Sequence, residues 1–291
     1  MFSGIVEEYA TLVALVKDQE NIHFTFKCSF VNELKIDQSI SHNGVCLTVV
    51  TLTDDTYTVT AMKETLERLL PKLNLSLTSA QLDTLARFGS LLLEKNQVMN
   101  LTAITEPQKV AELHFYDCLA LLNAADFRSK RVVDIGCGAG FPGVPLKIAE
   151  PSMALTLLDS LGKRMDWLRE VLPELQVEAN VVTARAEEYV TVCRESYDIA
   201  VSRAVARLNI LSELCLPYVK VGGCFVAMKG QLADVELDEA KRGIRLLGGR
   251  VERVYEYEVE DAIHRAVVIR KEAPTPSRYP RPFAKIKKTP L

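Results

Sequence analysis

The sequence has 291 residues, of which 48% are hydrophobic and 25% charged, and its formal net charge is −3. This composition is that of a globular protein with one large domain or two unequal ones, and no stretch reaches the roughly 20 apolar residues of a membrane helix. The N-terminus lacks the features of a secretory signal. Seven cysteines without a Cys-x-x-Cys pair, beside four histidines, argue against a structural metal site. We expect a cytoplasmic protein without a bound metal.

Residues 1–66 have the pattern of β structure. Apolar and polar residues alternate over 22–28, which predicts a half-buried strand. Segments 45–52 and 57–61 are β-branched and apolar, and Asp54-Asp55 supplies a turn between them. The last of these strands is expected to run into a helix over 67–70 without a linker.

Residues 67–125 change to helical spacing. Thr78 and Gln81 have the spacing of a capping box, and Leu82, Leu85 and Phe88 then share one helix face. A second helix is expected to start at Pro107.

Strands and helices alternate through 126–272. Strands are expected at 132–133, 154–158, 178–183, 197–202 and 224–228, and this alternation predicts a mainly parallel sheet. Two more, at 251–259 and 265–270, have no helix between them and should form an antiparallel terminal hairpin. Residues 273–291 are rich in proline and carry five Lys or Arg and no acid. This tail is either a solvated end or a contact for a polyanion.

The strongest chemical signal is a glycine loop directly after the first strand of 126–272. Gly136, Gly138 and Gly140 follow that strand, where a backbone without side chains can approach a ligand closely. Asp159 ends the next strand, the place from which a carboxylate accepts both hydroxyls of an adenosine ribose. Residues 138–143 also match GxGxxG, so a dinucleotide oxidoreductase is an alternative. Asp134, positioned to meet the cationic end of S-adenosylmethionine, and the antiparallel hairpin favour that cofactor instead.

The chain from 67 to 291 resembles the small-subunit ribosomal RNA methyltransferase G family. The segments that carry the resemblance are 100–105, 114–119, 133–147, 157–164, 185–188, 202–208, 215–223 and 225–230. The resemblance implies a Rossmann-like α/β fold of the class I S-adenosylmethionine-dependent methyltransferases, with 16S rRNA or the small ribosomal subunit as partner. It also implies methylation of N7 of one guanine. The cofactor contacts it implies, with Gly138 added from the loop, are Gly136, Phe141, Asp159, Ser160, Leu161, Ala186, Glu187 and Arg203.

Guanine N7 is an acceptor lone pair without a proton, so its methylation needs alignment and no general base. We therefore assign no catalytic acid or base. His114 and Asp117, three apart on the expected helix, either border the substrate pocket or form a hydrogen-bonded pair on the helix surface. Lys229, just after a strand, is expected to face RNA.

Residues 1–66 resemble a different family, the N-terminal lumazine-binding repeat of riboflavin synthase. The matching segments are 1–8, 43–49 and 64–66, and by this resemblance residues 4–6, 46–48 and 64–66 would line a flavin-like pocket. Only part of one repeat is present, which predicts an unclosed barrel and no riboflavin synthase activity. A flavin-binding module on an inert Rossmann-like body is therefore a further alternative. The sequence leaves the origin of the fragment and the oligomeric state open.

Overall fold

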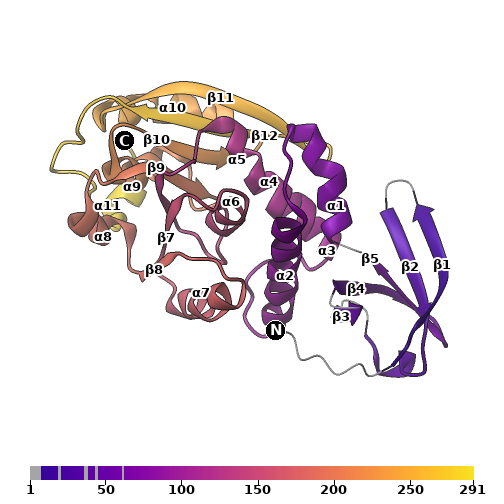
Figure 1. The fold of residues 1–291 in the computed structure, drawn as a ribbon. Coiled ribbons are helices and arrows are strands. Elements are labelled where there is room, and N and C mark those ends of the chain that lie inside the picture. Colours follow the sequence, from indigo (N-terminus) through magenta and orange to yellow (C-terminus); the bar gives the residue numbers. More distant parts are fainter. Residues whose placement is uncertain (1–7, 19–20, 36–38, 43–44, 61) are drawn as a thin grey trace. The chain divides into compact units, whose positions relative to one another are not determined.

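A computed structural model describes residues 8–18, 21–35, 39–42, 45–60 and 62–291. The chain divides into two compact units, Met1–Tyr116 and Asp117–Leu291. Figure 1 shows the elements of both. No helix in the described ranges is long and apolar enough to cross a membrane.

The first unit begins with an antiparallel sheet in the order β1-β2-β5-β4-β3. Its strands are β1 (Thr11–Asp18), β2 (Asn21–Lys27), β3 (Ser39–His42), β4 (Val45–Leu52) and β5 (Thr56–Thr60). The expected strands and the turn at Asp54-Asp55 are confirmed. Val31, Leu47, Val49 and Tyr57 form a small core on this sheet. β1 and β3 lie at opposite ends of the strand order and are not paired among the described strands, so the sheet is open there.

Helices complete the first unit. They are α1 (Met62–Leu69), α2 (Ser79–Asn96) and α3 (Pro107–Val110), with 3-10 turns at Val31–Glu33 and Leu70–Leu73 and a π-helical turn at Ala111–Tyr116. The capping box is confirmed, because Thr78 accepts from the Gln81 backbone N–H and the Gln81 side chain accepts from the Thr78 N–H. The helix expected over 67–70 starts earlier, at Met62. Met62, Leu66 and Leu69 are all buried at helical spacing, which explains the earlier start.

The second unit is built on a seven-stranded sheet in the order β11-β12-β10-β9-β6-β7-β8. The strands are β6 (Arg131–Ile135), β7 (Ala154–Asp159), β8 (Asn180–Thr183), β9 (Tyr197–Arg203), β10 (Val219–Lys229), β11 (Gly249–Val259) and β12 (Ala262–Lys271). β6 to β10 pair in parallel, whereas β12 is antiparallel to both β10 and β11. The expected parallel sheet with an antiparallel hairpin is therefore confirmed. The strand order reverses between β6 and β9, and open α/β sheets bind ligands at the carboxyl edge of such a switch point.

Helices pack against this sheet (Figure 1). They are α4 (Asp117–Leu119), α5 (Leu121–Ala124), α6 (Gly143–Ala149), α7 (Gly162–Glu174), α8 (Ala186–Cys193), α9 (Leu208–Cys215), α10 (Ala233–Leu246) and α11 (Phe283–Lys288), with a 3-10 turn at Leu216–Tyr218. Alternate strand residues such as Val133 and Ile135 face the core formed with α9 and α10. Asp134, between them in sequence, points to the opposite face.

The basic tail is an ordered part of the second unit. Arg281 pairs through two side-chain bonds, of 2.8 and 2.5 Å, with Glu213, which is fully buried in α9. Ile286 of α11 is also fully buried, and Leu291 lies against Gly243 of α10. A disordered tail is therefore wrong, because Arg281, Ile286 and Leu291 hold it against the second unit, although its lysines are exposed to solvent.

Candidate cofactor-binding site

The glycine loop joins β6 to α6 at the switch point of the sheet. Gly136, Gly138 and Gly140 have φ angles of +72°, +55° and +95°, a region that side chains disfavour. A Cβ atom at Gly140 would lie 2.7 Å from Val144 Cγ2, so that position also lacks space for a side chain. The backbone of this loop therefore requires glycine at these positions.

Asp134 lies beneath the loop and is fully buried. Its Oδ2 accepts the backbone N–H of Gly143 at 2.7 Å, while its Oδ1 has no hydrogen-bond partner among the described residues. Burial raises the pKa of Asp134 to about 7, although the bond from Gly143 and the charge of Arg203 both lower it. A buried acceptor without a donor fits a cationic ligand group that donates a hydrogen bond, and the ammonium of S-adenosylmethionine is such a group.

Asp159, the last residue of β7, ties the loop to the neighbouring strand. Its Oδ2 accepts the Gly138 backbone N–H at 3.0 Å and its Oδ1 accepts the Leu161 N–H at 2.9 Å. A carboxylate has about four acceptor positions, so capacity for two ribose hydroxyls remains. Ser160 and Leu161 are exposed beside it.

The other expected contacts come from the next strands along the same edge. Ala186 and Glu187 begin α8, and the Ala184 N–H donates to the Asp159 carbonyl at 3.0 Å, which holds this segment against β7. Arg203 ends β9, and its guanidinium lies 4.9 Å from the ring centroid of Phe141 in the loop. The structure thus brings residues from 134 to 203 to one edge of the sheet. Their contacts with a cofactor stay predictions.

Two sequence-based interpretations change. Lys229 does not face solvent, because its ammonium donates to the Ala206 carbonyl at 2.6 Å and pairs with Glu236 at 2.8 Å, with 7% of its side chain exposed. Its position at a strand end gave no signal of this burial. His114 and Asp117 are both buried, so neither belongs to a helix surface. His114 bonds Thr102, whereas Asp117 contacts Arg203 and the terminal hairpin, a connection that no sequence motif indicates.

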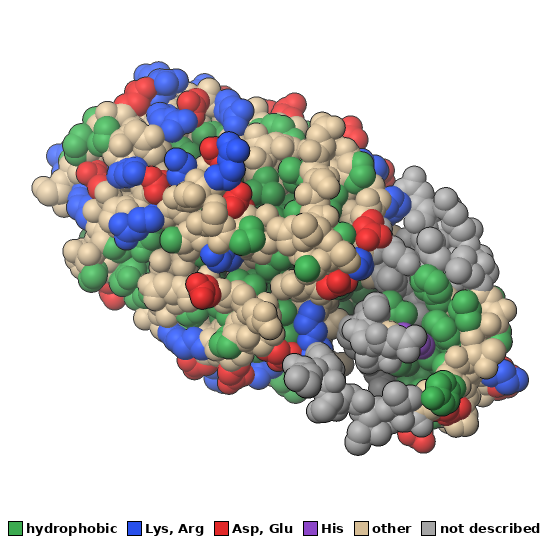
Figure 2. Space-filling view, in the orientation of Figure 1, with side chains coloured by type: hydrophobic (Ala, Val, Ile, Leu, Met, Phe, Trp, Pro, Cys, Tyr) green, Lys and Arg blue, Asp and Glu red, His purple; other side chains and the backbone are tan. Residues whose placement is uncertain are grey.

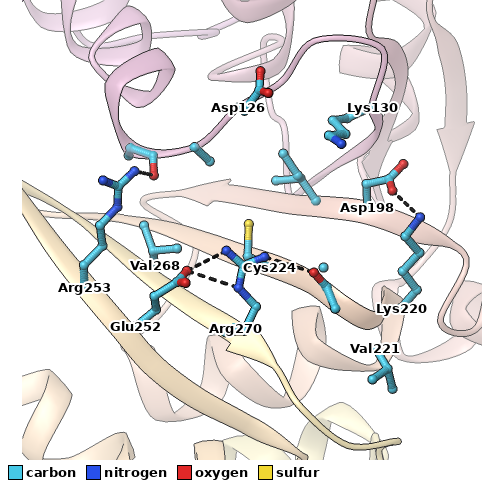
Figure 3. A pocket seen from close by; sticks show the side chains of 15 residues that line it. Asp126, Lys130, Asp198, Lys220, Val221, Cys224, Glu252, Arg253, Val268 and Arg270 are labelled. Atoms are coloured by element: carbon cyan, nitrogen blue, oxygen red, sulfur yellow. Dashed lines mark hydrogen bonds and ion pairs between the residues drawn. The ribbon is translucent and has the colours of Figure 1, made fainter.

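A cavity of about 660 Å³ opens at the opposite edge of the sheet, where β6 and β9 begin (Figure 3). Its charged groups largely neutralise one another: Lys220 pairs with Asp198, and Arg270 pairs with Glu252 at 2.7 Å. The cavity is lined by Lys130 and Asp198 near the strand starts and lacks the loop glycines. The residues expected from the sequence to bind the cofactor therefore lie at the glycine loop and not in this cavity.

Charges on the molecular surface are mixed. On the visible face, Lys and Arg side chains are interspersed with acidic ones and do not gather in one patch (Figure 2). Arg207 and Glu239, 2.7 Å apart, form one ion pair among the described residues. Paired charges of this kind weaken the field that the cations would otherwise produce.

Comparisons with known proteins match two parts of the chain to two different families. Residues 81–265 match the family described as rRNA small subunit methyltransferase G, and residues 3–74 match the lumazine binding domain. A Ribosomal RNA small subunit methyltransferase G from Alkaliphilus oremlandii is 45% identical over 236 residues, which are 79% of this chain and 99% of that protein. The protein of the same name from Brevibacillus brevis is 46% identical over 79% of this chain and 99% of its own length. A solved precorrin-6y C5,15-methyltransferase from Geobacter metallireducens shares 14% identity at a TM-score of 0.44, covering 60% of this chain and 92% of that one.

Proposed function

This chain belongs to the rRNA small subunit methyltransferase G family, and we propose that it methylates N7 of one guanine in the 16S rRNA of the small ribosomal subunit. S-adenosylmethionine is the methyl donor. The family assignment displaces the two alternatives, an oxidoreductase using the same glycine loop and an inert body under a flavin-binding module. A substrate of this kind also implies that the protein acts in the cytoplasm.

One observation carries this proposal: the match covers nearly the whole length of the relatives, and the residues expected to bind the cofactor lie within the part of the chain that the family matches. The loop glycines lie in the left-handed region, and Asp134 beneath the loop has an oxygen without a hydrogen-bond partner among the described residues. Asp159 stands at the end of the adjacent strand. The N-terminal fragment precedes this domain without replacing any of its site residues.

The methyl transfer requires no proton transfer by the protein. When bound, the donor supplies a methyl group on a cationic sulfur, and guanine N7 attacks with a lone pair that carries no proton. The protein therefore has to hold donor and base in line. Asp134 would meet the donor's positive charge, Asp159 would bind its ribose, and Arg203 with Phe141 would close the site from β9 and the loop. No residue is assigned to remove a proton.

The test is transfer of labelled methyl from S-adenosylmethionine to deproteinised 16S rRNA and, separately, to 30S particles lacking the modification. Aniline cleavage maps N7-methylguanine to a single position if the proposal holds. Asp159→Ala should reduce transfer through weaker donor binding, whereas Asp198→Asn, at the other edge of the sheet, serves as the matched control. Transfer to neither RNA by a chain that binds the donor would refute the proposed substrate.

A second ligand is suggested by the lumazine binding match over residues 3–74. Of the residues expected to line a flavin-like pocket, 4–6 lie outside the described residues, as do the side chains of 46, 48 and 64. Leu47 and Leu66 are buried, so they are core residues in this chain. We propose that the open sheet has no riboflavin synthase activity, and a titration of riboflavin fluorescence with the full chain tests residual binding.

A further inference from the structure

Asp117 of α4 is the centre of a buried polar cluster next to the candidate cofactor site. Its Oδ1 accepts a hydrogen bond from the Tyr257 hydroxyl at 2.9 Å and lies 2.8 Å from His264 Nδ1. Its Oδ2 lies 3.4 Å from Arg203 Nη1. Asp117 is 5% exposed, and its three partners are 86, 140 and 147 positions away in the sequence. The fold therefore assembles this cluster from four separate elements.

The terminal hairpin supplies two of the partners as a unit. Tyr257 of β11 and His264 of β12 are directly opposite each other in the antiparallel pairing, and their rings meet edge to face with centroids 6.0 Å apart. Tyr255 stacks on Tyr257 at 5.7 Å and limits its freedom further. Cross-strand pairs of this kind fix both side chains, so the hairpin presents two hydrogen-bonding groups to Asp117 in a defined geometry.

Asp117 has the partners that a buried acidic side chain requires. A buried carboxylate is stable only when it is hydrogen-bonded and paired with a cation, and this one has both. The bond to Asp117 raises the pKa of His264, with burial acting in the opposite direction and the charges of Asp117, Arg203 and Glu260 contributing less. The ring therefore retains its proton more readily beside the carboxylate than it would in water.

Arg203 connects this cluster to the glycine loop. Its guanidinium lies over the ring of Phe141, and its Nη1 lies 3.4 Å from Asp117 Oδ2, so one side chain contacts both the loop and the cluster. Arginine has several rotatable bonds, and fixing it in advance removes that entropy cost from ligand binding. An arginine held by Asp117 on one side and by Phe141 on the other is fixed in this way.

We propose that Asp117 is a positioning residue that orients Arg203 toward the cofactor, and that Tyr257 and His264 act through Asp117. The inference deepens the proposed function and rests on it for the identity of the ligand and for the contact of Arg203 with that ligand. It assigns the terminal hairpin a part in cofactor binding in addition to extending the sheet. None of the three residues touches the reacting atoms in this scheme.

A double-mutant cycle on the full-length chain tests the proposal. The dissociation constant of S-adenosylmethionine is measured by calorimetry for Asp117→Asn, Arg203→Ala and the double variant. We expect Asp117→Asn to weaken binding about tenfold, the scale of a charge-assisted hydrogen bond. The double variant should bind no more weakly than Arg203→Ala alone, because Asp117 acts only through Arg203. Losses that multiply in the double variant would overturn the proposal.

The His264 variants keep the test valid if Asp117→Asn does not fold. His264→Ala should weaken binding about threefold to tenfold, and His264→Asn should restore it within about twofold, because the asparagine amide can donate from the position of Nδ1. Failure of His264→Asn to restore binding would contradict the positioning role. The matched control is Asp198→Asn, which removes the acid of another ion pair at the opposite edge and should leave the dissociation constant unchanged.

The two proposals fail differently. Binding of S-adenosylmethionine does not require RNA, so the cycle gives its answer whether or not 16S rRNA is methylated. Coupled losses in binding without methyl transfer would leave the positioning role standing and refute the proposed substrate. Methyl transfer to 16S rRNA, together with binding losses that multiply in the double variant, would support the proposed substrate and refute the positioning role.

Discussion

Replacing Asp134 by asparagine separates the electrostatic role of this buried acid from its structural one. Asparagine has nearly the same shape, and its side-chain oxygen can still accept the Gly143 N–H that Asp134 binds at 2.7 Å. The substitution removes only the negative charge and places an amide at the position of the unpartnered Oδ1. We expect a more stable protein that binds its cofactor less well.

The magnitude follows from the pKa of Asp134, which burial raises from 3.8 to about 7. At about 1.4 kcal/mol per unit, a shift of roughly three units destabilises the ionised native state by about 4 kcal/mol. Between about pH 4 and pH 7 the native chain binds more protons at this group than the unfolded chain, so its contribution to the free energy of unfolding falls as pH rises. A buried amide without an acceptor costs about 1–2 kcal/mol. The free energy of unfolding of Asp134→Asn should therefore exceed that of the unsubstituted chain by about 2–3 kcal/mol at pH 8.5. At pH 4.5 the two should differ by less than about 1 kcal/mol.

Urea unfolding followed by tryptophan fluorescence measures this difference. Trp167 is the single tryptophan of the chain and is buried in α7, so its signal reports on the second unit. The affinity of the unsubstituted chain for S-adenosylmethionine should rise between pH 6 and 8, as Asp134 becomes ionised. Asp134→Asn should bind S-adenosylmethionine more weakly and should not show this rise. The control is Asp198. Burial raises its pKa, but hydrogen bonds from Lys220 and the Arg131 backbone lower it further, so the net shift is downward. Asp198→Asn should therefore lower the free energy of unfolding at pH 8.5. An equal change in stability for Asp134→Asn at both pH values would refute the reasoning.

Three further predictions concern the loop and the tail. Gly143→Ala would place a Cβ 2.8 Å from both an oxygen of Asp134 and a methyl of Leu157, and should lower the free energy of unfolding in urea by about 1–3 kcal/mol. As a control, Gly162→Ala should have no measurable effect, because the atom nearest to its added Cβ is 4.0 Å away. Arg281→Ala leaves the fully buried Glu213 without its cation and should lower the free energy of unfolding by about 3 kcal/mol. Adding Glu213→Gln to this variant should restore part of that loss, because it removes the unpaired charge. If the tail contacts RNA, alanine at the three exposed lysines of α11 should lower the slope of log affinity against log salt by about one per lysine, and an unchanged slope would exclude that contact. These lysines are Lys285, Lys287 and Lys288.

Local patterns in the sequence were sufficient for most elements of the fold. The capping box at Thr78 depends on residues three apart, and the loop at Gly136 depends on a strand directly before it. The absence of a helix between β11 and β12 was enough to predict their antiparallel pairing. Interactions that span a few residues leave a readable periodicity, which is why these predictions were confirmed.

Contacts between distant segments required the tertiary structure. No sequence pattern shows that Lys229 is covered by α10, that Arg281 pairs with a glutamate buried in α9, or that Asp117 meets Tyr257 across 140 residues. The burial of Asp134 on the face opposite Val133 likewise depends on which helix packs there. The sequence alone determined the order of strands and helices, the glycine loop and the family. Only the packing of helices on the sheet decided which charged groups lose their water and which partners they gain, because both depend on neighbours that chain spacing does not specify.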